Sequence, residues 1–235
     1  MTMRTLGLLC MTVLAVPLPS GATAQVSVVD EGSFTITRNG ARVGRETFTI
    51  RKTGIGAADA YVSNGTTDLD GRRLMPALQA DADFGPIKYQ LEVRKGDDVV
   101  ERLKGIAGRG RFSTQVRTSK GESTREFIAS DDAVLLDDDV FHQYYFVAQR
   151  ALKLGAAGGS IAVVMPQHAE QQVLRAKWAP DEAIAIAGRS VTAKHLVLTD
   201  ASGATQNVWV DAAGHVLKIS LDGRSLVIQR DQLPH

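Results

Sequence analysis

Apolar and polar side chains alternate with a period of two along much of the chain, as expected for strands that bury one face. Near the N-terminus, two such segments flank Asn39-Gly40, a dipeptide typical of the type I′ turn of a hairpin. A strict two-residue hairpin would place Phe34 and Phe48 on opposite faces. One extra residue would bring them to the same face, and we expect this bulge at Gly44.

A second alternating region near the C-terminus predicts another hairpin, with its turn at Asp222-Gly223. A two-residue turn places Ile219 opposite Leu226 and Leu217 opposite Ile228, with all four side chains on one face. Two further apolar segments precede this hairpin and are separated by glycine turns. The last third of the chain is therefore expected to be a meander of about four strands.

The middle of the chain contains further strand candidates. Asn64-Gly65-Thr66 fits a glycosylation sequon, but we interpret it as a turn. Residues 68–71 match only the start of a calcium loop and are also interpreted as a turn. The predicted strands are Ala60–Asp68, Gly71–Ala80, Ile87–Arg94, Val99–Gly105, Arg111–Thr118 and Thr124–Ala129.

One segment breaks the period of two and predicts a helix near residues 139–154. Its apolar side chains cover a broad face, so the helix should be largely buried. Asp137, Asp138 and Asp139 would lie at the positive end of the helix dipole, and Gly155 can end the helix. The predicted fold is mainly β: a strongly curved antiparallel sheet or open half-barrel wrapped around this one central helix.

The first 24 residues have the three parts of an export signal. Arg4 gives a positive start, residues 6–18 are apolar, and Ala22-Thr23-Ala24 has the form that signal peptidase cleaves. The apolar run is shorter than the roughly 20 residues of a membrane span, and Cys10 lies too early for a lipoprotein anchor. We therefore expect residues 1–24 to be a cleaved signal peptide. Residues 25–235 should form one β-rich domain, and the product should be periplasmic or secreted.

Composition narrows the class of protein further. The 235 residues are 44% hydrophobic and 23% charged, which excludes a disordered or collagen-like chain. The formal net charge of +1 falls to zero when Arg4 is removed, so no nucleic-acid partner is expected. The single cysteine, Cys10, would leave with the signal, which removes disulfide and thiol chemistry. No later segment is apolar enough for a transmembrane span.

No motif of a catalytic or cofactor site is present, so no catalytic residue and no cofactor is predicted. A hydrolase with a dispersed triad stays open as an alternative, because triad members need not be close in sequence. Ser160, Ser190 and His195 are available for such a triad, but no strand-turn-helix context marks a nucleophile.

Two charged regions allow a binding role but have a simpler structural interpretation. Asp138, Asp139 and His142 could bind a cation, but we favour carboxylates at a helix N-terminus and predict no metal site. Residues 94–125 hold nine basic and four acidic side chains that could meet anionic headgroups or glycans. We favour a solvated strand face whose charges protect the sheet edge.

Aromatic side chains gather on the predicted helix, where a curved sheet could leave an apolar cavity. Ordinary core packing is the alternative. The side chains that we expect to contact a ligand are Phe141, Tyr144, Tyr145, Ala148 and Trp209.

Both ends of the sequence resemble uncharacterised exported bacterial β-sheet proteins, a family with a domain of unknown function. The first segment, GSFTITRNGARVG, has an early G-x-F-x-I strand, a turn and V-G. More distantly, the layout is similar to the half-barrel of periplasmic lipoprotein carriers of the LolA and LolB type. That resemblance implies a curved antiparallel sheet with an apolar-ligand-binding shape, although the carriers have several helices rather than one. The second segment that resembles the uncharacterised family lies near the C-terminus, and its matching residues are Trp209, Val210, Asp211, Gly214, Val216, Leu217 and Lys218.

These observations favour an exported, non-enzymatic binding protein for a lipid or other apolar ligand. A structural or partner-binding module of the cell envelope, with an envelope protein as its partner, is the second hypothesis.

Overall fold

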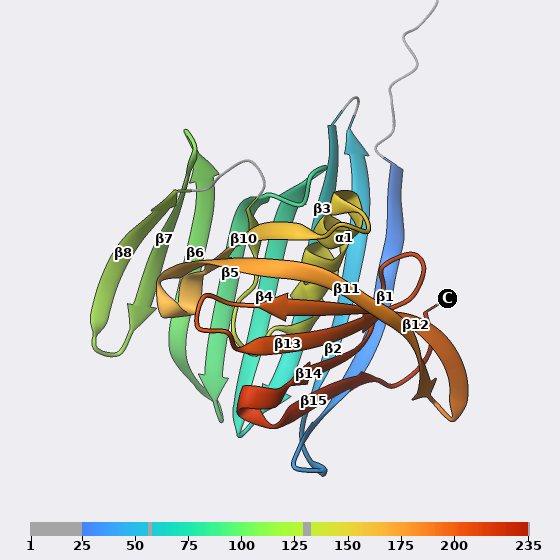
Figure 1. Ribbon diagram of the computed structural model, residues 1–235. Helices are drawn as coiled ribbons and strands as arrows, with labels where there is room; N and C mark the ends of the chain where they lie inside the picture. Colours follow the sequence, from blue (N-terminus) through green and yellow to red (C-terminus); the bar gives the residue numbers. More distant parts are fainter. Residues whose placement is uncertain (1–24, 56–57, 129–132, 235) are drawn as a thin grey trace, which may run out of the picture.

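The described residues of the computed structural model form one sheet around one helix (Figure 1). They are residues 25–55, 58–128 and 133–234, so the predicted signal peptide lies outside them. The sheet has 15 strands, in the order β8-β7-β6-β5-β4-β3-β2-β1-β15-β14-β13-β12-β11-β10-β9. All neighbouring strands pair antiparallel except β9 and β10, which pair parallel. In the described part of the chain, no helix is both long and apolar enough to cross a membrane.

The elements follow one another closely along the chain. Three short 3-10 turns lie at Phe141–Gln143, Pro166–His168 and Asp222–Arg224. The strands and the helix are β1 (Gln25–Arg38), β2 (Ala41–Ile55), β3 (Ala58–Leu69), β4 (Arg72–Asp81), β5 (Pro86–Lys95), β6 (Asp98–Gly108), β7 (Arg111–Thr118), β8 (Gly121–Ile128), β9 (Val134–Leu135), α1 (Tyr144–Leu154), β10 (Gly159–Met165), β11 (Glu170–Ile186), β12 (Arg189–Thr199), β13 (Thr205–Val210), β14 (Val216–Leu221) and β15 (Leu226–Arg230).

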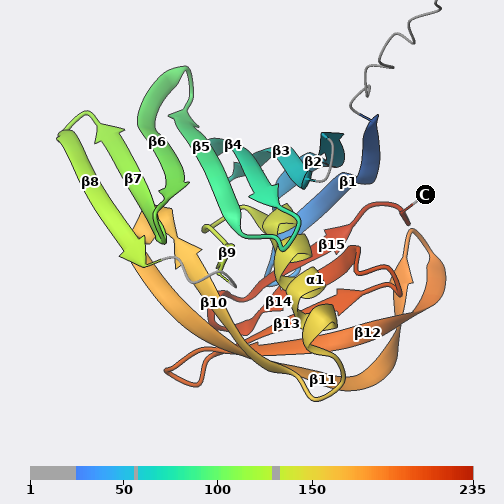
Figure 2. The ribbon, with the colours of Figure 1, turned by 90° about the horizontal axis from the view of Figure 1, so that it is seen from above.

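The sheet curves around α1, which lies between its two halves (Figure 2). β1–β5 pass on one side of the helix, β10–β15 pass on the other, and β6–β8 extend away from it. The prediction of a mainly β, strongly curved antiparallel sheet around one central helix is confirmed. The six predicted middle strands correspond to β3–β8, and β7 has the predicted bounds, Arg111–Thr118.

The core fills the space between the helix and the inner face of the sheet. Phe141, Phe146 and Ala148 from the helical segment pack with apolar side chains from both halves of the sheet. Full burial of one large apolar side chain contributes about 1.5–3 kcal/mol, so this helix is a main source of stability for both halves. The helix ends at Gly155, as predicted, with φ 74°.

The N-terminal hairpin contains the predicted bulge. The extra residue is Val43, which has no partner on β1, rather than its neighbour Gly44. The bulge brings Phe34 and Phe48 to the same face, where their ring centroids lie 5.0 Å apart. A Cβ atom at Gly44 would lie 2.3 Å from the backbone oxygen of Asp68, so this position requires glycine.

The predicted register of the C-terminal hairpin is wrong by two residues. Ile219 faces Ile228 rather than Leu226. The loop has four residues instead of two, because a 3-10 turn at Asp222–Arg224 is followed by Ser225 in the left-handed conformation, with φ 52°. The turn dipeptide was therefore located correctly, but its geometry was not.

The predicted turn at Asn64-Gly65 is also wrong, because both residues lie inside β3. Gly65 pairs with Phe48 on β2 and faces the helical segment. A Cβ atom there would lie 2.7 Å from Cε1 of His142. The glycine allows a histidine ring to approach the sheet, and it does not mark a turn.

Candidate functional site

A buried carboxylate from β2 binds the start of the helical segment. Glu46 accepts hydrogen bonds from the backbone N–H groups of Phe141 at 2.9 Å and His142 at 3.2 Å. It also binds Nδ1 of His142, whose ring stacks on Phe48 with centroids 5.6 Å apart. A carboxylate placed at unpaired N–H groups satisfies them and complements the helix dipole. Glu46 thus has the role at the helix N-terminus that was predicted for Asp137, Asp138 and Asp139.

The three aspartates before the helix bind three partners outside it, which corrects the predicted capping role. No acidic residue lies in the first turn of α1. Residues 136–139, called the strap from here on, cross from β9 to the helix. The contacts of the strap are Asp137 Oδ1 with the N–H of Gln167 (2.9 Å), Asp138 Oδ2 with His168 Nε2 (2.7 Å) and Asp139 Oδ1 with Arg224 Nη2 (2.5 Å).

Asp137 is the most perturbed carboxyl of the strap. Its side chain is only 3% exposed, and burial raises its pKa to about 7. Its Oδ2, the hydroxyl of Tyr89 and Nε2 of Gln143 have no hydrogen-bond partner among the described residues. Burial also raises the pKa of Tyr89 well above its usual value. A buried carboxyl with a pKa near neutrality can exchange a proton under ordinary conditions, which makes this cluster a candidate functional site.

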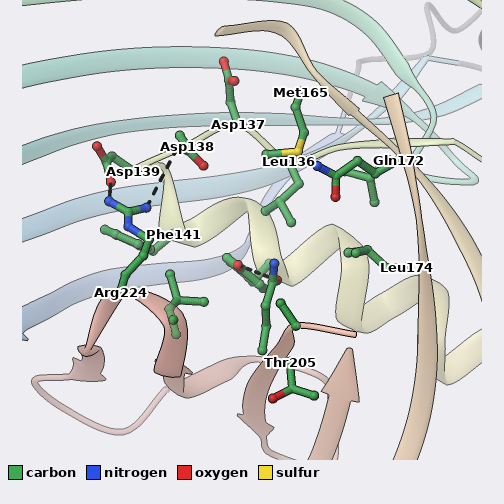
Figure 3. Close-up of a pocket in the computed structure, with 16 residues that line it drawn as sticks. Leu136, Asp137, Asp138, Asp139, Phe141, Met165, Gln172, Leu174, Thr205 and Arg224 are labelled. Carbon is green, nitrogen blue, oxygen red and sulfur yellow. Dashed lines mark hydrogen bonds and ion pairs between the residues drawn. The ribbon is translucent and has the colours of Figure 1, made fainter. Parts of the chain in front are cut away.

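On its other side the strap forms one wall of a cavity of about 160 Å³ (Figure 3). The lining residues Thr205 and Arg224 are exposed and Gln172 is half-buried, and they mark the side open to solvent. The cavity is therefore apolar inside and polar at its opening, as ligand cavities commonly are. Its apolar lining comes from the strap, the helical segment, β10, β11 and β14: Leu136, Phe141, Val163, Met165, Leu174 and Leu221.

Two of the five predicted ligand residues line this cavity, namely Phe141 and Tyr144. The hydroxyl of Tyr144 donates to Oε1 of Gln206 at 2.8 Å, and burial raises its pKa. Tyr145 stacks instead on His215, with centroids 6.4 Å apart. Ala148 is fully buried in the core and is not part of the lining. Their role in binding stays a prediction.

Trp209 lies on the opposite face of the sheet from the cavity. Val208 and Val210 point to the main core, so the side chain between them points outward. Its Nε1 donates to Glu182 at 2.9 Å, and His195 stacks on it at 4.6 Å. It packs with Leu217, which a bulge between β13 and β14 moves away from the predicted inner face. Trp209 anchors the long β11–β12 hairpin to the outer face.

The other candidate groups are not brought together. His195 binds Asn207 and Glu182, and neither Ser160 nor Ser190 is its partner. Asp138 and His142 bind different partners. The described residues contain no group of three or more histidine, cysteine, aspartate or glutamate side chains placed to hold a metal ion.

The basic segment runs along β5–β8, where carboxylates neutralise part of its charge. Glu92 pairs with both Arg94 and Arg102, and Arg117 pairs with Glu122. These ion pairs are half-exposed or exposed, so each contributes at most about 1 kcal/mol. The arrangement matches a solvated strand face.

Sequence reasoning missed most of the cavity lining. β10 and β11 were not predicted, although residues 161–164 are a short apolar run of the kind found in buried strands. Arg224 and Asp139 are 85 positions apart, so no local pattern could pair them.

Comparisons with known proteins support the fold alone. No protein-family model matches the sequence, and no curated protein matches it. A crystal structure of a β-barrel-like protein of the domain of unknown function DUF1849, from Brucella abortus, is similar with a TM-score of 0.58 at 10% identity. The match covers 88% of this chain and 97% of that one. A DUF1089 family protein from Pseudomonas aeruginosa matches with a TM-score of 0.40 at 15% identity, over 88% and 94% of the two chains. The chain thus has a fold similar to that of a β-barrel-like protein of unknown function, while export and the resemblance to lipoprotein carriers stay predictions.

Proposed function

We propose that this protein is an exported, non-enzymatic binding protein that holds a lipid or another apolar molecule at the cavity beside the strap. The observation that carries this proposal is the apolar cavity of about 160 Å³ at the N-terminal end of the helical segment. Well-packed cores rarely contain voids much larger than a water molecule, so an apolar cavity with a polar opening suggests an occupant.

The volume of the cavity limits what can enter it. An engineered protein cavity of about 150 Å³ stays dry and binds benzene. The present cavity is of the same size, so it suits one ring or a short hydrocarbon chain. A long acyl chain would insert only its end. The ligand class is therefore a small apolar molecule, or an amphipathic one whose apolar end enters while its polar part stays at the opening near Arg224 and Gln206.

Native mass spectrometry of the protein purified from its own cell envelope tests for a natural occupant. Toluene and hexan-1-ol are suitable probes in a calorimetric titration because both match the cavity in size. The ε-methyl group of Met165, which lines the cavity, reports entry by NMR. A protein that carries no bound molecule and binds neither probe would refute the proposal.

Two variants separate binding from stability. In Val163→Phe the added ring atoms enter the cavity, so we expect probe binding to be lost while the protein stays folded. Leu217→Ala removes a buried side chain from the outer cluster around Trp209. This change should cost about 2–5 kcal/mol of stability but leave probe affinity unchanged. Equal probe affinity in the wild type and in Val163→Phe would show that the probe binds elsewhere.

A partner-binding module of the cell envelope is the second candidate function, and the end strand β8 favours it. β8 is exposed along most of its length, and its pairing with β7 contains no bulge. Long regular edge strands invite pairing with another chain unless they are blunted. Crosslinking in cells from position 124 on β8, compared with position 66 on the outer face of β3, tests this role. Recovery of one partner from β8 alone would favour it.

A further inference from the structure

The strap separates two different environments. Leu136 points into the cavity, while the carboxyl group of Asp137 points away from it (Figure 3). There it meets a buried polar cluster that includes Tyr89 and Gln143. The N–H of Asp137 donates to Oε1 of Gln143 at 2.7 Å. Any movement that exposes the Asp137 carboxyl therefore also displaces a wall of the cavity.

The three aspartates tether the strap to two parts of the fold. Asp137 and Asp138 bind the 3-10 turn after β10, through Gln167 and His168. Asp139 binds Arg224 in the turn between β14 and β15. Its φ of 60° lies in the left-handed region, which is unfavourable for a residue other than glycine. The side chain of Asp139 thus holds this end of the strap through its contact with Arg224.

Lowering the pH favours the closed strap at two of these residues. Among the described residues no cation pairs with the buried carboxyl of Asp137, so its neutral form suits the closed position. His168 binds the carboxylate of Asp138 most strongly as an imidazolium, and the pKa of His168 is raised by this contact. Low pH therefore favours closure by removing the buried charge of Asp137 and by strengthening the His168–Asp138 pair, and high pH does the reverse.

Other ionisable groups surround the two residues. Glu101 lies half-buried on β6 with one unpartnered carboxylate oxygen, and burial raises its pKa. Arg224 also approaches Asp138 at 4.0 Å. The titratable and charged groups that act on Asp137 and His168 are Tyr89 on β5, Glu101 on β6, Arg72 on β4 beside Glu101, Asp138 in the strap, Arg224 beside it, and Glu170 on β11.

We propose that the strap is a proton-dependent latch on the cavity, closed when Asp137 is neutral and His168 is charged, and loosened when both lose their protons. This inference rests on the proposed function only in assuming that the cavity holds a ligand, which the closed strap would retain. The latch itself is a property of the chain without ligand. A ligand in the closed cavity would be held at acidic pH and released as the pH rises above neutrality.

Hydrogen exchange measured without ligand tests the latch by itself. The reporters are the N–H groups of Asp137 and Gln167, which the closed strap protects. If the released carboxyl returns to a pKa near 3.8, the opening equilibrium should rise about 30-fold between pH 5.5 and 8 after correction for intrinsic exchange. In Asp137→Asn most of this rise should disappear, and only the part due to His168 should remain. A rise of less than tenfold in the wild type, or an equal rise in the variant, overturns the latch.

His168→Gln provides a second variant at a half-exposed position, where folding is not at stake. It should reduce the rise in exchange without abolishing it, because Asp137 still titrates. An unchanged rise would remove His168 from the latch.

Binding of toluene at the two pH values then tests the coupling. We expect the wild-type affinity to fall at least about threefold from pH 5.5 to pH 8, and that of Asp137→Asn to fall clearly less. Failure of toluene to bind at either pH refutes the proposed function but leaves the exchange result standing. Binding that is equal at both pH values in the wild type overturns the latch as a regulator of the cavity.

Discussion

Replacing Asp137 by asparagine should change the pH dependence of stability in a way that can be calculated. The pKa of Asp137 is about 7 in the folded protein, against 3.8 in an unfolded chain. Because the folded value is the higher one, protonation of Asp137 favours folding. Its contribution is fully present below pH 3.8 and is lost as the pH rises to about 7.

The size of the effect follows from the same two values. The folded protein binds its proton more tightly by about three pKa units, which corresponds to about 4 kcal/mol when both states are ionised. Between pH 5 and pH 8 the wild type should lose about 2–3 kcal/mol of stability through this group. Asparagine does not titrate, and its side-chain oxygen can still accept the hydrogen bond from Gln167.

Urea denaturation of both proteins at pH 5, 6, 7 and 8 measures this difference directly. The stability of Asp137→Asn relative to the wild type should rise by about 2–3 kcal/mol across the series. Asp83→Asn is the matched control, because the ion pair with Lys153 lowers the pKa of Asp83, which therefore does not titrate in this range. Parallel profiles for the wild type and Asp137→Asn would refute the assignment of a near-neutral pKa to this carboxyl.

Three further substitutions test contacts that hold the site together. In Glu46→Gln an amide group replaces the carboxylate that accepts hydrogen bonds from two backbone N–H groups. The free energy of unfolding, measured by urea denaturation, should fall by about 1–3 kcal/mol. Gly65→Ala places a methyl group against the His142 ring and should lower the free energy of unfolding by about 1–3 kcal/mol. Gly108→Ala is the control, because its methyl group meets no atom within 4 Å and should change the melting temperature little. Arg230→Met removes the cation that pairs with the buried carboxylate of Asp30, 2.6 Å from Nη2 of Arg230, and should cost about 3–5 kcal/mol of stability in the same assay; a loss below about 1 kcal/mol would show that the pair is not important for folding.

Local patterns in the sequence were sufficient to locate most strands of the fold. The alternation of apolar and polar residues placed β3–β8, and it is clearest in β4 and β5, which bury one face against the core. The bulge near Gly44 could be derived because Phe34 and Phe48 must share a face. Gly155 marked the end of the helix, since its positive φ is available mainly to glycine.

The candidate site depends on contacts that local patterns do not contain. Glu46 and Phe141, which form the helix cap, are 95 positions apart. Trp209 was predicted as a ligand residue, but the parity of β13 turns its side chain outward. A bulge between β13 and β14 changes that parity for Leu217, and no glycine or turn residue at that position signals it.

The aspartates before the helix were misread for a reason that bears on function. A carboxylate near a helix N-terminus has an obvious local role, and the sequence alone gives no reason to look for another. In the structure Glu46 fills that role from the sheet, which leaves three adjacent carboxyl groups free to bind elsewhere. Burying one of them is unfavourable for folding above neutral pH, and a neutral side chain would avoid that loss. Asp137 is an ionisable group that opposes stability, and it lies in the wall of an apolar cavity. Such a local conflict is expected at a functional site rather than in an ordinary core.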